Sequence, residues 1–172
     1  MKTRRILSVT AALAVLSILA ACAAPGDAGA PVPPGTTPAS PSGPIEGTWV
    51  DVAVSGDVVT MPLSLVEEKV NTHFSVTETD RRLDFMAYVL DGALYVRANA
   101  CPPCRSRGFA LDEDVLVCDA CATKFKARDG SGIVGACVDY PKADAAYTVV
   151  DGVVSMSLAD LAAAYAETLV RG

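Results

Sequence analysis

Six cysteines carry most of the chemistry that this sequence offers, and four of them form two Cys-x-x-Cys motifs. Cys101 and Cys104 make the first motif, Cys118 and Cys121 make the second, and 13 residues separate the two. Each motif places two sulfur atoms on one side of a tight loop, so two such loops can bring four thiolates into a tetrahedron. Four sulfur ligands are typical of zinc and of iron or iron–sulfur centres. The spacing predicts a metal site with these four ligands, at a separation slightly shorter than the usual four-cysteine zinc pattern.

Cys137 is a further thiol, 16 positions after Cys121, and it leaves the ligand set open. It could be a fifth ligand, an alternative ligand or a neighbour of the site. The motifs could also form disulfides in an oxidising compartment, although a bridge within one motif closes too short a loop to stabilise much. A redox-active thiol pair is less favoured, because neither motif opens a predicted helix, the setting that lowers a thiol pKa.

Charged and imidazole side chains near the motifs are the next candidates. His73 is the single histidine, and we expect it to be packed or at the surface rather than a metal ligand. Residues 97–128 hold six bases and only four acids, in a chain with a formal net charge of −6. This local excess would offset the negative charge of a metal bound by four thiolates. Solvated strand faces would account for it equally well.

The overall composition excludes several classes of function. A chain of 172 residues has room for one ordinary domain, and 51% hydrophobic residues exclude general disorder. The acidic balance argues against nucleic-acid binding, which needs clustered Lys and Arg to displace counterions from phosphate. No nucleophile with a neighbouring base is visible in the sequence, so we expect a metal-binding protein or electron carrier and not an enzyme.

The N-terminal segment has the features of an export signal with a lipid-attachment site. Residues 1–21 begin with basic residues, and 13 of the 16 residues 6–21 are apolar, too short a stretch for a spanning helix. The small residues before Cys22 resemble the bacterial lipobox, which implies cleavage there and acylation of Cys22. The alternative is an ordinary secretory signal in which Cys22 is incidental. Residues 3–7 also resemble part of a twin-arginine export motif, although adjacent arginines are common in such segments.

Residues 22–44 are predicted to be the lipidated cysteine and an extended tether, because 11 of the 22 residues 23–44 are Pro or Gly. Removal of residues 1–21 would leave 11 bases and 20 acids, a net charge near −9. We therefore expect a protein held by its lipid at the cell membrane or in the envelope, on the exported side.

Residues 45–172 are predicted to form one mainly β domain, a compact β-sandwich or barrel-like fold with a C-terminal helix. Asp91-Gly92 and Asp151-Gly152 are hairpin turn signals. Apolar alternation and turn signals predict strands at residues 48–54, 57–63, 72–77, 83–90, 93–97, 109–111, 115–117, 123–126, 147–150 and 153–157.

Only the C-terminal segment has a convincing helical pattern. Residues 157–160 have the pattern of an N-terminal capping box. One face of this helix, expected to cover the sheet, would carry Leu158, Leu161, Ala162, Tyr165 and Leu169.

From Val59 to Pro141 the sequence resembles the membrane iron–sulfur-containing, FtrD-like family. The matching pieces occur in order: Val59 to Ser64, Asp91-Gly92, the first motif with Gly108-Phe109, the second motif with Lys124-Phe125, and Gly135-Ala136-Cys137 ending at Tyr140-Pro141. The resemblance implies a cysteine-ligated iron–sulfur or related metal centre. Cys101, Cys104, Cys118 and Cys121 match the family's paired motifs, and Cys137 matches its later single cysteine.

The resemblance also implies a setting for the protein. Some members accompany ferrous-iron permeases and cupredoxin-like partners, and many carry membrane spans where this chain has only the predicted lipid anchor. The later motif here is Gly-Ala-Cys and departs from the Gly-Gly-Cys-Asn-Pro-like form of the family. Two metal-binding loops in a β-rich domain are similar to those of Rieske domains, whose histidines this sequence lacks.

Three hypotheses follow. The first is an envelope lipoprotein whose centre carries electrons, with a link to iron uptake and to envelope redox or ferrous-iron transport partners. The second is a zinc-ribbon-like binding module with structural zinc and no redox role. The third is a disulfide-stapled, adhesin-like domain without metal.

Overall fold

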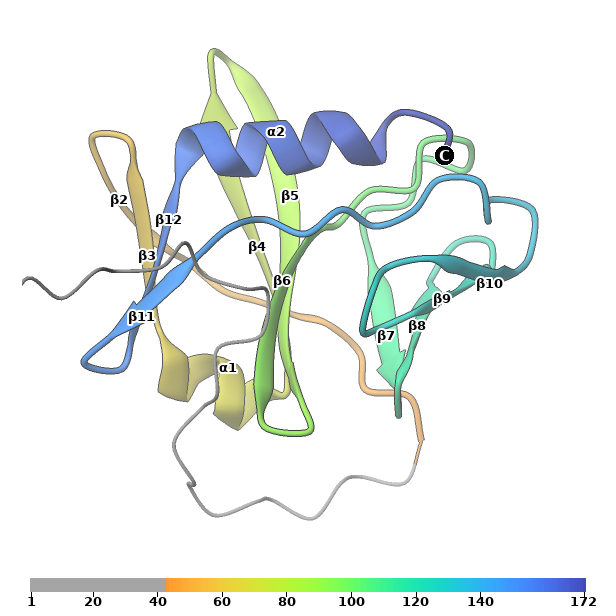
Figure 1. Ribbon diagram of the computed structural model, residues 1–172, viewed down its shortest axis with the longest axis horizontal. Helices are drawn as coiled ribbons and strands as arrows, with labels where there is room; N and C mark the ends of the chain where they lie inside the picture. Colours follow the sequence, from red (N-terminus) through yellow and green to blue (C-terminus); the bar gives the residue numbers. More distant parts are fainter. Residues whose placement is uncertain (1–42) are drawn as a thin grey trace, which may run out of the picture.

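The computed structural model describes residues 43–172, which fold into three four-stranded sheets and two helices (Figure 1). The predicted signal peptide, Cys22 and most of the predicted tether lie outside the described residues. The helices are α1 (Leu63–Lys69) and α2 (Leu158–Thr168). The strands are β1 (Thr48–Trp49), β2 (Ala53–Ser55), β3 (Val58–Pro62), β4 (Asn71–Glu78), β5 (Arg81–Leu90), β6 (Ala93–Ala98), β7 (Phe109–Asp112), β8 (Val115–Cys118), β9 (Lys124–Lys126), β10 (Gly132–Val134), β11 (Thr148–Val150) and β12 (Val153–Ser157).

The three sheets are almost entirely antiparallel. Sheet A has the order β1-β4-β5-β6, sheet B the order β10-β9-β8-β7, and sheet C the order β11-β12-β3-β2. Only the short β1–β4 pairing is parallel. Sheet B lies at the right of Figure 1, and α2 runs along the top across β4 and β5, where it also contacts β6 and β12. The prediction of a mainly β fold with a C-terminal helix is confirmed.

Strand β5 lies between two hydrophobic cores. Phe85 and Ala87 point into the first core, which sheets A and C share with both helices, whereas Met86 and Tyr88 point into the second core. Successive side chains of a strand face opposite sides, so both faces of β5 are buried. The second core fills the space between sheets A and B, and it contains cysteines from the predicted metal site.

The predicted Asp-Gly turns are present. Asp91 and Gly92 have φ values of 51° and 75°, and Asp151 and Gly152 have 50° and 75°. Positive φ at both central residues is the signature of the turn that suits the twist of a two-residue hairpin. The register of β5–β6 and of β11–β12 is fixed by these turns.

The N-terminal strand prediction is partly wrong, because residues 48–54 form two strands that belong to different sheets. Trp49 ends β1, which pairs with β4 in sheet A, while β2 pairs with β3 in sheet C. The apolar alternation continues through residues 50–52 because Val50 and Val52 still pack against the first core as the chain crosses between sheets.

Helix α1 was not predicted. It buries only Leu63 and Val66, its N-cap residue Pro62 offers no side-chain hydrogen bond, and it ends where Val70 takes a φ of 65°. Seven residues show too little periodicity to be distinguished from the end of a strand.

The C-terminal helix begins as predicted, with the Ser157 hydroxyl accepting a hydrogen bond from the Asp160 backbone N–H at 3.0 Å. Its buried face differs in part from the expected one. Leu161 is buried, and Leu158, Ala162 and Tyr165 pack against the first core, as expected. Ala164 and Thr168 are buried as well, whereas Leu169 lies beyond the helix and is 41% exposed.

Candidate metal centre

The two Cys-x-x-Cys motifs fold into equivalent tight loops. The first joins β6 to β7, and the second joins β8 to β9. In the first, the Cys101 N–H donates to the Ser106 carbonyl and the Arg105 N–H donates to the Cys101 carbonyl. In the second, the Cys118 N–H donates to the Thr123 carbonyl and the Ala122 N–H donates to the Cys118 carbonyl.

The residue after each second cysteine has a left-handed backbone, with φ of 60° at Arg105 and 54° at Ala122. This conformation reverses the chain at the same point of both loops. The matching turns therefore present both pairs of sulfurs in the same way.

The structure brings the four predicted ligands together. The Sγ atoms of Cys101, Cys104, Cys118 and Cys121 all lie within 4.8 Å of one another, and the Cys104 and Cys118 sulfurs are 3.6 Å apart. Four sulfurs bound at about 2.3 Å to one tetrahedral ion would be separated by about 3.8 Å. The four sulfur ligands and the distances between them therefore fit a thiolate-bound metal, which can be zinc as well as iron.

Burial divides each loop into an inner and an outer thiol. Cys101 and Cys118 are buried, whereas Cys104 and Cys121 are half-buried. The described cysteines are free thiols, and a separation of 3.6 Å between Cys104 and Cys118 is far longer than the roughly 2.05 Å of a disulfide bond. The site is thus closed toward the second core and open toward solvent on one side.

Cys137 lies against this group from a third segment. Its Sγ atom is 3.7 Å from that of Cys121, and its backbone N–H donates to the Thr123 hydroxyl at 3.2 Å. The side chain is buried. Cys137 does not belong to the set of four mutually close sulfurs, so the geometry makes it a neighbour of that set.

The thiols differ in acidity. Burial raises the pKa of Cys101 and of Cys118. Burial acts in the same direction on Cys121, but hydrogen bonding with the Thr123 side chain and backbone outweighs it and lowers the pKa of Cys121 to about 6. In the metal-free protein, Cys121 is therefore the thiol that ionises most readily among these three.

Lys142 is a neighbour of the site that sequence reasoning missed. Its side chain is fully buried, and its ammonium donates to the Ala100 carbonyl at 2.7 Å, next to Cys101. The same ammonium lies over the rings of Phe125 and Phe109, 4.6 Å and 5.4 Å from their centroids. Burial lowers the pKa of Lys142 to about 8, and the nearby thiols oppose that shift.

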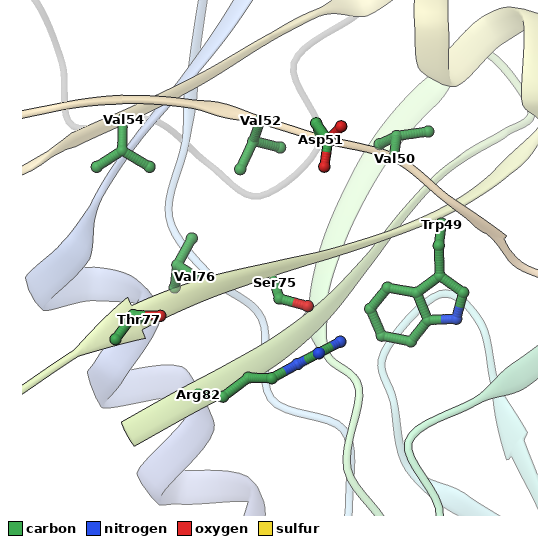
Figure 2. Close-up of a pocket in the computed structure, with 9 residues that line it drawn as sticks. All are labelled: Trp49, Val50, Asp51, Val52, Val54, Ser75, Val76, Thr77 and Arg82. Carbon is green, nitrogen blue, oxygen red and sulfur yellow. The ribbon is translucent and has the colours of Figure 1, made fainter. Parts of the chain in front are cut away.

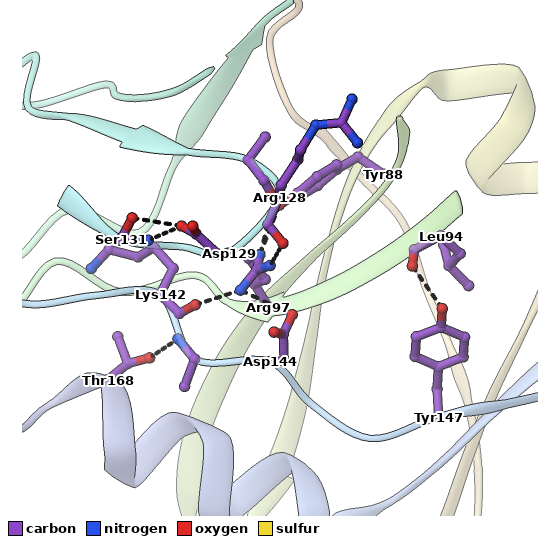
Figure 3. Close-up of polar contacts among 12 residues, drawn as sticks. Tyr88, Leu94, Arg97, Arg128, Asp129, Ser131, Lys142, Asp144, Tyr147 and Thr168 are labelled. Atoms are coloured by element: carbon purple, nitrogen blue, oxygen red, sulfur yellow. Dashed lines mark hydrogen bonds and ion pairs between the residues drawn. The ribbon is translucent and has the colours of Figure 1, made fainter. Parts of the chain in front are cut away.

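The basic residues counted from the sequence are mostly engaged elsewhere. Arg97 is fully buried and donates to carbonyls of residues 127, 128 and 142, with Asp144 as its ion-pair partner at 2.9 Å (Figure 3). Arg107 pairs with Asp84, and Arg128 pairs with Asp91. These contacts fix loops of sheet B to sheet A. With the exposed Lys126–Asp129 pair, four of the six counted bases have a carboxylate partner.

His73 is buried and packed away from the cysteine group. Its ring makes an edge contact with Trp49, with centroids 5.3 Å apart, and a Cβ atom at Gly47 would lie within 2 Å of it. Burial lowers the pKa of His73 to about 4. The imidazole therefore serves packing between β4 and the N-terminal segment.

A separate cavity of about 640 Å³ lies between residues 49–54 and the adjoining parts of β4 and β5. Figure 2 shows Trp49 and Arg82 on one side of it, where the guanidinium lies 5.3 Å from the indole centroid. Its lining includes none of the cysteines. It is therefore distinct from the metal site.

The family model for "Membrane iron-sulfur containing protein FtrD-like" matches residues 66–167, a span that includes both motifs, Cys137 and Lys142. The chain belongs to this family. An iron–sulfur or other thiolate-bound metal site is thus supported both by the family and by the cluster of four cysteines. No curated protein matches the chain.

Two solved structures are similar to part of this chain. A chain from the "Complex of reduced oxygenase and oxidized ferredoxin in carbazole 1,9a-dioxygenase" is 19% identical, with a TM-score of 0.43 over 51% of this chain and 81% of that one. The Sphingomonas yanoikuyae B1 ferredoxin is 20% identical, with a TM-score of 0.41 over 48% of this chain and 81% of that one.

Within residues 43–172, no helix is both long enough and apolar enough to cross a membrane. The predicted lipid attachment at Cys22 falls outside the described residues.

Proposed function

We propose that this protein is an electron carrier whose centre is held by Cys101, Cys104, Cys118 and Cys121. The observation that carries the proposal is the convergence of four thiols from two equivalent loops in a chain of an iron–sulfur family. An iron or iron–sulfur centre on these sulfurs would supply one-electron chemistry at a potential set by burial, hydrogen bonds and charge. We favour such a centre over structural zinc.

The protein's own part is to hold the sulfurs rigidly and to control which of them reach water. Cys101 and Cys118 anchor the site in the second core, and Cys104 and Cys121 lie at the half-exposed edge. Electrons would enter and leave through that edge, because it is the side open to a partner. Cys137 would act as a neighbouring thiol that adjusts the site through Cys121.

We also propose a setting on the exported side of the cell membrane, with Cys22 lipidated and the domain tethered by residues 23–44. The partners would be envelope redox proteins or a ferrous-iron transport system, and the electron transfer would serve iron uptake. The support is the family's membrane description and the sequence of the N-terminal segment. Labelled fatty acid should be incorporated by the wild-type protein but not by Cys22→Ala, and deletion of the gene should slow uptake of labelled ferrous iron.

Anaerobic purification followed by metal and inorganic sulfide analysis tests the main proposal. We expect iron, with visible thiolate-to-metal absorption that bleaches on reduction. Cys104→Ser and Cys118→Ser should lose the absorption, whereas Cys137→Ser is the matched control, because it removes a buried thiol beside the site and should retain the metal. Stoichiometric zinc without colour would contradict the electron-carrier proposal.

A structural zinc module is the second candidate, and one observation favours it. The sulfur separations suit a single tetrahedral ion without rearrangement of the loops, and such an ion can be zinc as readily as iron. In that case the metal would stabilise sheet B, and reductants would leave the loaded protein unchanged.

A further inference from the structure

Lys142 is a fully buried cation without a carboxylate partner. Among the described residues, its ammonium donates to one carbonyl oxygen, that of Ala100, and otherwise meets two aromatic faces. No acidic side chain lies within ion-pair distance of it in residues 43–172. An ammonium removed from water is costly unless an opposite charge lies near it.

The contrast with Arg97 shows that this fold supplies a carboxylate where a buried cation needs one. Arg97 is equally buried, but Asp144 lies 2.9 Å from its guanidinium, and several carbonyls accept its other hydrogens. The two cations are neighbours, because Arg97 donates to the Lys142 carbonyl (Figure 3). One is therefore compensated within the protein, and the other is not.

The groups that face Lys142 electrostatically are the thiols. Cys101 directly follows the residue whose carbonyl the ammonium binds, and Cys101, Cys118, Cys137 and Cys104 are the ionisable groups that raise the pKa of Lys142 against the effect of burial. As thiols they are neutral and offer no compensation. Three of them, Cys101, Cys104 and Cys118, belong to the predicted ligand set. As thiolates around a metal, these three and Cys121 carry net negative charge, because four thiolates exceed the charge of a divalent or trivalent ion.

We propose that Lys142 is the internal counter-charge of the metal–thiolate centre, favouring metal loading and the reduced state of the metal. The statement about the reduced state rests on the proposed function, whereas the statement about metal loading requires only that the site binds a metal. The chemistry is a fixed positive charge beside an anionic group. It stabilises the loaded site relative to the empty one, and it stabilises the reduced site more because reduction adds negative charge.

The test uses Lys142→Gln, whose amide can still donate to the Ala100 carbonyl, so that charge is removed while a donor is retained. Lys142→Met removes the donor as well, and Lys142→Arg keeps the charge. Lys126→Met is the matched control, since it removes one positive charge from an exposed position of β9 in the same sheet. If the methionine variant folds poorly, the glutamine variant decides the question.

Two measurements separate a counter-charge from a merely structural residue. Chelator competition with Co²⁺ as the probe should give at least tenfold weaker binding for Lys142→Gln, with Lys142→Arg and Lys126→Met close to wild type. Denaturation of the reduced, metal-free protein should show Lys142→Gln at least as stable as wild type, because a buried uncompensated charge is gone. A structural role predicts the opposite: a less stable metal-free protein with unchanged metal affinity, and that result would overturn the inference.

Redox titration of the iron-loaded protein gives the third readout. Lys142→Gln should lower the equilibrium constant for one-electron reduction at least tenfold, which corresponds to about 59 mV. An unchanged potential with unchanged Co²⁺ affinity would overturn the inference and leave the proposed function standing. A wild-type chain that binds neither iron nor Co²⁺ would overturn both.

Discussion

Asp84 ties the first cysteine loop to sheet A, and its replacement by Asn should be among the most damaging polar substitutions outside the metal site. Its side chain is only 2% exposed. It accepts hydrogen bonds from Ser75 at 2.9 Å, from Arg82 at 2.8 Å, and from two nitrogens of Arg107. Arg107 lies between Cys104 and β7, so this pair fixes the loop from its outer side.

The expected size follows from the number and exposure of these bonds. A hydrogen bond to a charged group contributes about 1.5–3 kcal/mol when it is buried. The side chains of Arg107 and Arg82 are 49% and 53% exposed, so water and salt recover part of what the substitution removes. We therefore expect Asp84→Asn to lower the free energy of unfolding by about 2–3 kcal/mol, which lowers Tm by roughly 6–12 °C for a domain of this size.

The pH dependence has a definite sign. Burial raises the pKa of Asp84, but the hydrogen bonds from Arg107, Arg82 and Ser75 outweigh it and hold the pKa below its ordinary value of 3.8. A carboxyl whose pKa is lower in the folded state stabilises the protein above its unfolded-state pKa. That stability is lost as the pH falls through the folded value. The difference between wild type and Asp84→Asn should thus be constant from pH 8 to about pH 5 and should shrink below about pH 4.

Urea denaturation between pH 8 and pH 3 measures this difference, with Asp91→Asn as the matched control. Asp91 also pairs with an arginine, Arg128, but both side chains are more than half exposed. Its φ of 51° suits Asn as well as Asp, so the turn should persist. We expect no detectable change for the control. A difference for Asp84→Asn that is no larger than the control at pH 7, or that persists undiminished at pH 3, would refute the reasoning.

Two further predictions concern the support around Thr123. Thr123→Val removes the hydroxyl that forms a hydrogen bond with Cys121, so the pKa of Cys121 should rise from about 6. In the reduced, metal-free protein, alkylation of this thiol by iodoacetamide should then require a higher pH, which peptide mass mapping can follow. Gly135→Ala should destabilise the fold by about 2 kcal/mol or more in urea, because φ is +126° and the added Cβ would lie 2.6 Å from the Thr123 hydroxyl oxygen.

Each of these has a clear contrary result. An unshifted alkylation profile in Thr123→Val would mean that the hydroxyl does not govern Cys121. Gly43→Ala is the control for Gly135→Ala, because Gly43 has the same φ of +126° with nothing within 4 Å of an added Cβ. Equal effects at the two glycines would show that the contact with Thr123 costs nothing.

The parts of the fold that could be predicted were those with short-range causes. Each Asp-Gly turn depends on two adjacent residues, and the N-cap of α2 depends on Ser157 and Asp160. Each Cys-x-x-Cys loop depends on the four consecutive residues of its motif. The long apolar run of β5 was also predicted as a strand. The structure shows why the run is continuous, because each face of this strand packs into a different core.

What could not be predicted depends on contacts across the chain. Residues 48–54 look like one strand because alternation does not reveal that β1 and β2 join different sheets. Because several basic residues are close to the cysteines in sequence, we expected them to offset the negative charge of a thiolate-bound metal. In the structure, Arg97 and Arg128 instead pair with carboxylates. Lys142 lies outside that window and has no local pattern of its own, so only its burial beneath the loops identifies it.

The second core links metal loading to the stability of sheet B. Three of its ten residues are Cys101, Cys118 and Cys137, so the wall that closes this core is also the inner side of the metal site. The strands of sheet B have only three or four residues each, and they depend on links to sheet A such as the Tyr88 hydroxyl bonded to the Ala127 carbonyl at 2.6 Å. Because metal binding to sites that only the folded chain completes adds to folding free energy, loss of the metal should weaken sheet B before sheets A and C. This packing would also hold the sulfurs still during the proposed electron transfer, since any movement of the two loops must disturb a packed core.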